Sequence, residues 1–510
     1  MATASEAQSP VIRSTIPARI DRLGWSPFHT RMVMALGVAW VLDGLEITIA
    51  SNLTADLTKS STLHMSTSGV ADIATWYLIG EVIGALFFGR LSDKLGRRNL
   101  FMITLGVYLL GSGLTAAAQS GSGAWVIYLY ATRVLAGSGI GGEYAAINSA
   151  IDEMIPARYR GRIDIAVNGT YWAGALIGTT ATLFFLNKVS PNLGWRLAFL
   201  VGPVLGAVVL YVRRNLPESP RWLVMHGRVE EAERSIAQVE EEASRDGRQL
   251  PPVDESKAIE IVPSARIGYV ALLRVLFRQY PQRSVLVGVL MATQSFLYNA
   301  IFFTYGLVLS KFFHVSAGNV PYYFYAFAAG NLLGPLTIGR LFDTLGRKKM
   351  IAGTYILSGV LLIISAQLFK NGDLTATTQT LCWTVIFFFA SAGASAGYLT
   401  ASEVFPIEVR AQAIAVFFAI AQGFGSLGSH LYGHLIGNGS DPNKLYVGYL
   451  IGAGAMILGG LVEVFLGVDA EGKSLEDVAS PLSAVRKKVS SAISDAARGG
   501  GAVPGAPGTT

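Results

Sequence analysis

The stretch GRLSDKLGRR, residues 89–98, places four cations and an aspartate between two long apolar runs. A second version, GRLFDTLGRK, begins 250 positions later (339 − 89) at residues 339–348. The same offset relates further residues in the neighbouring runs and turns: Gly80, Gly84, Glu153, Pro156 and Arg160 to Gly330, Gly334, Glu403, Pro406 and Arg410. An offset shared by two apolar runs and two polar turns predicts that the chain is built from two related halves.

The composition is that of a membrane protein. Of the 510 residues, 51 % are hydrophobic and only 15 % are charged, and the mean hydropathy is +0.45. A soluble chain carries roughly a quarter charged residues, and a helix needs about 20 apolar residues to cross a bilayer. The predicted spans are 31–53, 71–91, 99–118, 124–146, 165–187, 195–212, 283–309, 322–341, 350–369, 379–399, 412–437 and 445–467.

These spans predict an all-α membrane protein with twelve transmembrane helices in two pseudo-symmetric six-helix halves. The predicted domains are a cytoplasmic N-terminal segment, a first bundle, a cytoplasmic linker with short helices, a second bundle and a cytoplasmic tail: 1–28, 29–212, 213–282, 283–468 and 469–510. The linker contains a segment with Glu230 and Arg234 at helical spacing, which predicts a solvated helix. The tail is rich in Ser, Ala, Gly and Pro, which predicts that it is largely disordered.

The positive charges are concentrated in alternate turns. Arg90, Lys94 and Arg98 follow the second span and Lys348 and Lys349 follow the eighth, whereas the turn after the third span has no cation. Because Lys and Arg accumulate on the cytoplasmic side, we expect a multi-pass protein of the cell (inner or plasma) membrane with both termini in the cytoplasm. The net charge of +6 then reflects topology, and no nucleic-acid partner is expected.

The repeated turn resembles the signature loop of the major facilitator superfamily, and the likeness extends from about residue 20 to 478. In that superfamily the charged turns close the cytoplasmic side and separate when the protein opens inward, so the resemblance implies the major facilitator fold and a cytoplasmic gate. The gate residues it implies are Gly89, Asp93, Arg97, Glu153, Arg160, Gly339, Asp343, Arg347, Glu403 and Arg410.

Further motifs are similar to those of the sugar porters. They are PESPRWLVMHGR (217–228), RVLAGSGIGGE (133–143), GKSLED (472–477) and, in part, TQSFLYNAIFF (293–303). The resemblance implies that Gln294 and Asn299 contact sugar hydroxyls and that Asn168 stands where these porters usually carry glutamine. Tyr398, in ASAGY, replaces their tryptophan, and Tyr305 is a further predicted substrate contact.

Two other motifs favour a different substrate. RIDRLGWSPFH (19–29) and LDGLE (42–46) are similar to the opening of proton symporters for aromatic and other organic acids, and the sugar-porter Gly-Pro-x-Pro-Trp pattern is absent from the tenth span. A sugar or polyol and an organic acid are therefore both candidate substrates. If the substrate is a carboxylate, Arg133 could bind it directly.

Ionisable residues inside predicted spans are costly and usually functional. Asp43 and Glu46 lie three apart in the first span, on nearly one helix face. The resemblance aligns Glu46 with the acid of a sugar-porter Gly-Tyr-Asp motif and Arg133 with the arginine that faces it. Burial favours a protonated carboxylate and a nearby arginine an ionised one, so a motion that separates this pair would load and release a proton. Asp43 is the alternative carrier, and a permanent structural ion pair is the alternative role.

The sequence argues against an enzyme. Residues 467–474, GVDAEGKS, have the spacing of a nucleotide-binding Gly-Lys-Ser loop, but they follow the last apolar span and not a strand. There is also no Cys/His metal set, so neither a cofactor nor a metal is expected. The only cysteine, Cys382, rules out an internal disulfide. We predict a monomeric, proton-coupled symporter whose partners are a small-molecule substrate, H⁺ and the lipid bilayer. The alternatives are a facilitator or exporter, and a non-transporting sensor on the same fold.

Overall fold

The chain folds into long helices. The computed structural model describes residues 12–53, 57, 60, 62–63, 65, 67–119, 123–213, 218–245, 249–261, 268–316, 318–406, 408–437, 439–473, 475–480 and 482. The first half contains α2 (Pro27–Asn52), α4 (Thr67–Leu95), α5 (Arg97–Thr115), α6 (Gly123–Met154), α7 (Ala157–Gly169), α8 (Tyr171–Lys188) and α9 (Pro191–Arg213). The second half contains α13 (Pro281–Phe312), α14 (Val320–Ile338), α15 (Leu341–Thr344), α16 (Arg347–Asn371), α17 (Ala376–Glu403), α18 (Arg410–Ile436) and α19 (Pro442–Leu466).

These helices coincide with the twelve predicted spans. Within the described residues, eight helices are long and apolar enough to cross a membrane by length and composition alone, namely α2, α4, α9, α13, α16, α17, α18 and α19. The other four predicted spans correspond to α5, α6, α14 and the α7–α8 pair. The fifth span is divided at Thr170, whose hydroxyl donates to the carbonyl oxygens of Val167 (2.6 Å) and Gly37 (3.1 Å). A hydroxyl that bonds to backbone in this way can bend a helix.

The internal repeat predicted from the sequence recurs in the helix packing. In the first half, a Cβ added to Gly84 of α4 would lie 2.0 Å from the carbonyl oxygen of Ser138 in α6. In the second half, a Cβ on Gly334 of α14 would lie 2.0 Å from the carbonyl oxygen of Phe388 in α17. The 250-residue offset relates Gly84 to Gly334 and Ser138 to Phe388. Such close backbone approach requires glycine, so the repeated glycines determine the same helix contact twice.

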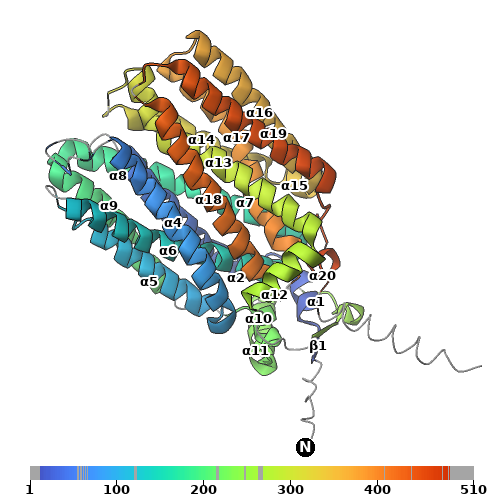
Figure 1. Cartoon of the computed structure of the whole chain (residues 1–510). Coiled ribbons are helices and arrows are strands. Elements are labelled where there is room, and N and C mark those ends of the chain that lie inside the picture. Colours follow the sequence, from blue (N-terminus) through green and yellow to red (C-terminus); the bar gives the residue numbers. More distant parts are fainter. Residues whose placement is uncertain are drawn as a thin grey trace, which may run out of the picture.

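The two halves meet along two symmetry-related interfaces. In one, α4 of the first half packs on α18 of the second, and the two helices lie side by side in Figure 1. In the other, α7 and α8 pack on α14 and α17. The fold class predicted from the sequence, two pseudo-symmetric halves of six spans, is confirmed.

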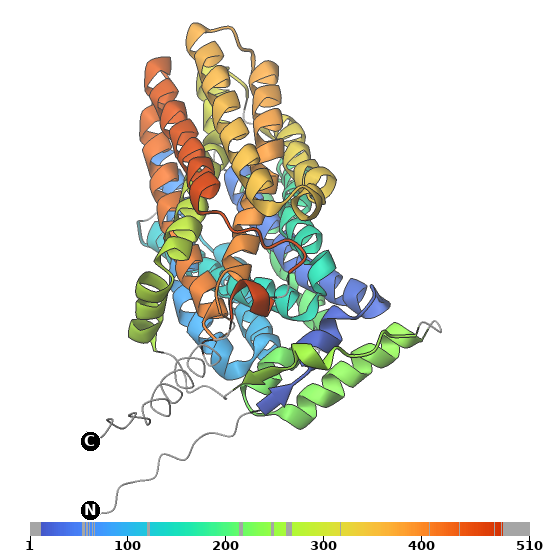
Figure 2. The same ribbon diagram turned by 90° about the vertical axis from the view of Figure 1, so that its right-hand side faces the viewer.

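A small cap covers one end of the bundle, which we call the linker end. It contains β1 (Ile12–Ser14), α1 (Ile16–Asp21), α10 (Pro220–Met225), α11 (Val229–Ser244), η1 (Glu255–Lys257), β2 (Ile259–Ile261), α12 (Tyr269–Arg274), η2 (Val275–Gln279) and α20 (Leu475–Val478). Strands β1 and β2 pair antiparallel with Ile12 opposite Ile261 and Ser14 opposite Ile259, as Figure 2 shows. This two-stranded ribbon is an addition to the predicted all-α fold. Residues 483–510, predicted to be disordered, lie outside the described residues.

The N-terminal segment is bound to the linker by ion pairs. Arg19 donates to Glu240 (2.5 and 2.9 Å) and to Glu233, and Arg22 donates to Glu240 (2.6 Å). Arg31, in the first turns of α2, pairs with Glu242 at 2.6 Å. The linker helix α11 is therefore not simply solvated, as its sequence predicts, but is the docking surface for the start of the chain.

Each half also receives an acidic cap from the segment that follows it. Gly96 and Gly346, both at positive φ (83° and 104°), precede α5 and α16. Glu218 of the PESPRW motif accepts the Arg97 and Arg98 amides at 2.9 and 3.2 Å. Glu471, beside the GKSLED motif, accepts the Arg347 amide at 3.5 Å. Carboxylates are favourable at helix N-termini because the first amides there have no partner within the helix.

Candidate functional site

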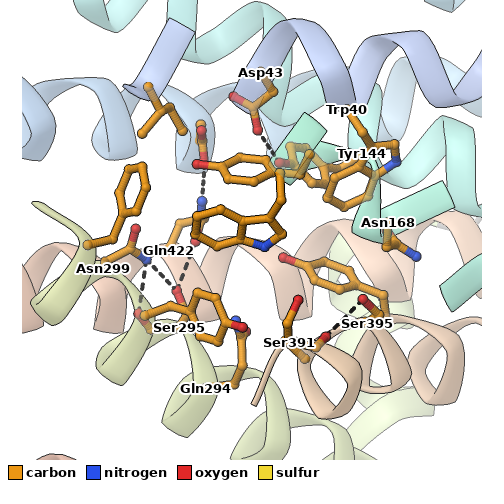
Figure 3. Close-up of a pocket in the computed structure, with 18 residues that line it drawn as sticks. Trp40, Asp43, Tyr144, Asn168, Gln294, Ser295, Asn299, Ser391, Ser395 and Gln422 are labelled. Atoms are coloured by element: carbon orange, nitrogen blue, oxygen red, sulfur yellow. Dashed lines mark hydrogen bonds between the residues drawn. The ribbon is translucent and has the colours of Figure 1, made fainter. Parts of the chain in front are cut away.

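A cavity with an empty volume of about 680 Å³ lies between the two halves. Its walls come from α2, α4, α6, α7 and α8 on one side and from α13, α17 and α18 on the other. The lining residues are Trp40, Asp43, Ile47, Glu81, Tyr144, Asn168, Tyr171, Trp172, Gln294, Ser295, Tyr298, Asn299, Phe302, Ser391, Ala394, Ser395, Tyr398 and Gln422. Figure 3 shows Trp40 and Asp43 facing Gln294, Ser391 and Ser395 across this space.

Four of the five predicted substrate contacts line the cavity: Asn168, Gln294, Asn299 and Tyr398. Tyr305 is not among the described lining residues. Its ring is buried against Phe324 and Trp383, and its hydroxyl lies 3.2 Å from that of Thr380. Tyr305 lies about three turns beyond Gln294 and about two turns beyond Tyr298 along α13, where the helix packs against neighbouring helices.

The two acids of the first span have separate surroundings. Asp43 lines the cavity and accepts hydrogen bonds from Tyr77 (2.9 Å) and Tyr144. Glu46 is completely buried inside the first half, where Arg133 donates to its Oε1 at 2.6 Å. The predicted Glu46–Arg133 pair therefore exists, and Asp43 is not part of it.

Arg133 is fully engaged behind the cavity wall. Its guanidinium donates to Thr115 (2.6 and 3.1 Å) as well as to Glu46, and lies 4.9 Å from the centre of the Phe199 ring. Glu46 in turn accepts from Ser112 and, at 3.3 Å, from Tyr108. Arg133 is not among the described residues that line the cavity, and its guanidinium pairs with Glu46.

Glu81 of α4 is the second carboxylate that lines the cavity. It is completely buried, and its Oε2 accepts a hydrogen bond from the Gln422 amide of the opposite half. Its Oε1 has no hydrogen-bond partner among the described residues. Sequence analysis missed Gln422 and Ser295, which are joined by a 2.9 Å hydrogen bond. The available signal was a polar side chain in an otherwise apolar span.

Aromatic rings form much of the remaining wall. Trp40 meets Tyr144 edge-on with ring centres 4.2 Å apart, and Tyr398 lies 5.6 Å from Trp40. On the other side, Trp172 packs edge-on against Phe302 at 5.5 Å. Edge-to-face packing fixes such rings relative to one another, so the cavity has a stiff apolar frame with polar groups set into it.

The predicted gate residues form a charged cluster at the linker end. Arg97 donates to Glu153 at 2.9 Å within the first half, and Arg347 pairs with Glu403 at the repeat-related position in the second. Arg347 also pairs with Asp343 at 3.2 Å.

Two contacts of this cluster cross between the halves. Arg160 lies 3.7 Å from Glu403, and the Arg162 amide donates to Asp343 at 2.8 Å. The structure therefore joins the halves at the linker end.

The remaining gate predictions are placed as follows. Arg410 donates to the carbonyl oxygen of Phe405 at 3.1 Å. The glycines lie one at each interface between the halves: a Cβ on Gly89 of α4 would meet Ala415 of α18, and one on Gly339 at the end of α14 would come within 3.0 Å of Ile165 of α7. Asp93 lies near the end of α4, but its side chain is outside the described residues.

Comparisons with known proteins agree with this architecture. The family model described as "Sugar (and other) transporter" matches residues 41–481. The niacin transporter NiaP of Acinetobacter baylyi is 26 % identical over 462 residues, which cover 90 % of this chain and 99 % of that protein. The glucose transporter GlcP of Staphylococcus epidermidis is 25 % identical over 459 residues, which cover 88 % and 96 %.

Solved structures show the same fold. A structure of XylE, described as a major facilitator superfamily proton:xylose symporter bound to 6-bromo-6-deoxy-D-glucose, has a TM-score of 0.73 at 18 % identity and covers 88 % of this chain and 98 % of that chain. The inward-open structure of XylE from E. coli has a TM-score of 0.63 at 18 % identity, covering 88 % and 99 %. The chain thus has the major facilitator fold and is a multi-pass membrane protein.

Proposed function

Since the chain belongs to the sugar (and other) transporter family, we propose that it is a proton-coupled symporter that carries a small polar metabolite across the membrane by alternating access. The observation that carries this proposal is the central cavity, which lies between two related halves that are joined at the linker end by Arg160 and Glu403. Rocking of two such halves about a central site is the usual mechanism in transporters with internal repeats.

The linker end faces the cytoplasm in this proposal. Arg90, Lys94 and Arg98 are exposed there in the first half, and the related turn of the second half carries Arg340 and Lys349. This concentration of cations is typical of cytoplasmic turns. Opening toward the cytoplasm then requires the Arg160–Glu403 and Arg162–Asp343 contacts to break.

Glu46 is the proposed proton carrier. Glu46 is buried in α2, the helix that also carries Asp43 of the cavity wall, and its partner Arg133 is in α6. A shift of α2 relative to α6 therefore changes the distance between the carboxylate and the guanidinium. A carboxylate that leaves its arginine partner in a buried site takes up a proton, and it releases the proton when the pair re-forms. The proton:xylose symporter with the same fold gives a precedent for such coupling.

A sugar or polyol is the favoured substrate over a free carboxylic acid. The amides of Asn168, Gln294 and Asn299 and the hydroxyls of Ser391 and Ser395 can each donate to or accept from a ligand hydroxyl. A carboxylate ligand would find no arginine, lysine or histidine among the described lining residues. Arg133 of the first half donates to Glu46 and is not among the described lining residues.

The test is uptake by purified protein in proteoliposomes with an imposed proton gradient. Labelled sugars, polyols and benzoate-like acids are supplied outside an alkaline lumen. We expect accumulation of a hydroxyl-bearing compound above its external concentration, and loss of that accumulation when an uncoupler collapses the gradient. Uptake that is only downhill and is unchanged by the uncoupler would identify a facilitator. Binding without uptake or counterflow would identify a sensor.

A further inference from the structure

The charge of the cavity wall restricts the substrate further. Asp43 and Glu81 both line the cavity, and they are 1 % and 0 % exposed. Among the described lining residues no arginine, lysine or histidine accompanies them. Two carboxylates removed from water without a cationic partner are unfavourable, because a buried charge needs pairing and hydrogen bonds. The described lining residues therefore provide negative charges without a positive one. A cationic ligand could supply that positive charge.

Glu81 is only half satisfied. Gln422 donates to its Oε2, but its Oε1 is buried, has no hydrogen-bond partner among the described residues, and belongs to a side chain that lines the cavity. Leaving such an acceptor unpaired costs more than an ordinary hydrogen bond contributes. A donor on the ligand would pair with this oxygen.

Asp43 of α2 provides the second negative charge. Its two oxygens accept from the hydroxyls of Tyr77 and Tyr144, which are neutral donors and do not neutralise the charge. The rings of Trp40 and Tyr144 lie next to it, with centres 4.2 Å apart. Aromatic faces attract cations through their quadrupole, most strongly in sites that exclude water.

We propose that the central cavity binds a small organic cation, a metabolite with a protonated or quaternary nitrogen, with Glu81 and Asp43 as its counter-charges. The amides and serine hydroxyls orient the rest of the ligand, so the cationic group can be carried by a hydroxyl-bearing scaffold such as an amino sugar. This inference rests on the proposed transport function and adds the sign of the substrate's charge.

The experiment measures binding to the purified full-length protein by calorimetry at neutral pH. Two series keep the scaffold and change only the charge: benzylammonium, benzyl alcohol and benzoate, and glucosamine, glucose and glucuronate. In each series we expect the cation to bind about tenfold more tightly than the neutral compound, as for a hydrogen bond to a charged group, and the anion to bind most weakly.

Charge-removing variants test the assignment to the two carboxylates. Asp43→Asn and Glu81→Gln should each reduce the preference for the cation, whereas Glu463→Gln should keep it. Glu463 is a suitable control because it is a buried carboxylate of α19 that does not line the cavity. Thermal unfolding without ligand checks that each variant folds, and where one does not, the wild-type charge series decides.

Three results would overturn the proposal. They are equal or tighter binding of the neutral compound or anion, no detectable binding of either cation at millimolar concentration, and a cation preference that survives in both Asp43→Asn and Glu81→Gln. Because calorimetry reports binding and not flux, such a result leaves alternating-access transport standing. Failure of uptake in proteoliposomes would conversely leave a measured charge preference intact.

Discussion

At the residue scale, two acids one helical turn apart have different surroundings. Asp43 and Glu46 are three residues apart, which corresponds to a rotation of about 60° around the helix axis. That rotation is enough to place Asp43 on the cavity and Glu46 against Arg133. The sequence spacing predicts nearly one face, but a difference of 60° decides which carboxylate lines the cavity and which pairs with the arginine.

Replacing Glu46 with glutamine should separate proton coupling from substrate movement. Glu46→Gln keeps the shape of the side chain but cannot be ionised, so it cannot act as the proposed proton carrier. We expect gradient-driven accumulation to fall to the equilibrium level while exchange of labelled for unlabelled substrate continues. Glu463→Gln is the matched control. Gradient-driven accumulation at the wild-type level in Glu46→Gln would exclude Glu46 as the carrier.

The lining positions show which residues of the cavity could be predicted from the sequence. Asn168, Gln294 and Asn299 line the cavity, as a resemblance carried by local motifs predicts. Gln422 and Glu81 were harder to assign. A polar residue in an apolar run is expected to lie inside the membrane, but the sequence does not show whether its side chain faces the cavity or a neighbouring helix. That direction is determined by packing between α4 and α18, which come from different halves.

At the scale of elements, each half depends on a glycine contact. The Cβ of a larger residue at Gly84 or Gly334 would lie 2.0 Å from a backbone carbonyl oxygen of the next helix, and backbone cannot move aside as a side-chain tip can. The contact explains why glycine recurs at the 250-residue offset.

Gly84→Val and Gly334→Val should therefore destabilise the protein, by about 3 kcal/mol or more, since overpacking alone costs 1–3 kcal/mol. The measurement is thermal unfolding in detergent, followed by the fraction of protein that remains monodisperse. Gly353→Val is the control, because Gly353 is also helical and has open space around it. An equal loss of stability in all three variants would attribute the effect to helix propensity and not to helix contact.

The docked N-terminal segment is a second element-scale feature, and it is sensitive to pH. Burial acts to raise the pKa of Glu240, but the hydrogen bonds from Arg19 and Arg22 outweigh it and lower that pKa below the ordinary glutamate value of 4.5. A group whose pKa is lowered in the folded state stabilises it above the unfolded pKa and loses that contribution as the pH falls through the folded value. The docking contact is therefore complete at neutral pH and weakens below pH 4.5.

Hydrogen exchange of residues 12–22 can follow this contact. After correction for the intrinsic exchange rate, we expect constant protection from neutral pH down to 4.5 and progressive loss below it. Arg19→Gln should raise exchange about tenfold at neutral pH, as for loss of a hydrogen bond to a charged group. Arg228→Gln removes an exposed pair with Glu231 that does not touch this segment and should change nothing. Loss of protection on raising the pH would contradict the assignment.

At the scale of the whole molecule, the charged cluster of the linker end is the structural basis of the proposed gate. Glu403 is shared by Arg347 of its own half and Arg160 of the other, and all three side chains are at most 2 % exposed. Removing one partner of a buried charge pair is strongly unfavourable for the charge that remains. The closed linker end should therefore be sensitive to a single substitution.

Arg160→Gln should shift the population toward the form open at the linker end. In a Cys382→Ser background, a cysteine introduced by Ser395→Cys reports access to the cavity. With an impermeant maleimide, we expect labelling about tenfold faster in inverted vesicles and slower in right-side-out vesicles, within the usual range of conformational coupling. Arg19→Gln, which breaks an ion pair that does not join the halves, is the control. Unchanged labelling from both sides would remove Arg160 from the gate.

The overall fold could be predicted because its determinants are long or repeated. Apolar runs define the helices, and the offset between GRLSDKLGRR and GRLFDTLGRK defines the two halves. The ribbon between Ile12–Ser14 and Ile259–Ile261 could not be predicted, since each strand has only three residues and the pairing joins distant parts of the chain. The division of the fifth span at Thr170 was also missed, because it depends on a hydrogen bond to Gly37 in another helix.

The acidic caps on α5 and α16 have a consequence for biosynthesis. Glu218 meets the amide of Arg97 from 121 residues further along the chain, and Glu471 meets that of Arg347 from 124 residues further along. A ribosome must therefore finish all six spans of a half before the third span of that half receives its cap. Each half is completed by the last segment translated for it. A nascent chain released just short of residue 218 or 471 would therefore form a bundle in the membrane that lacks this acidic cap.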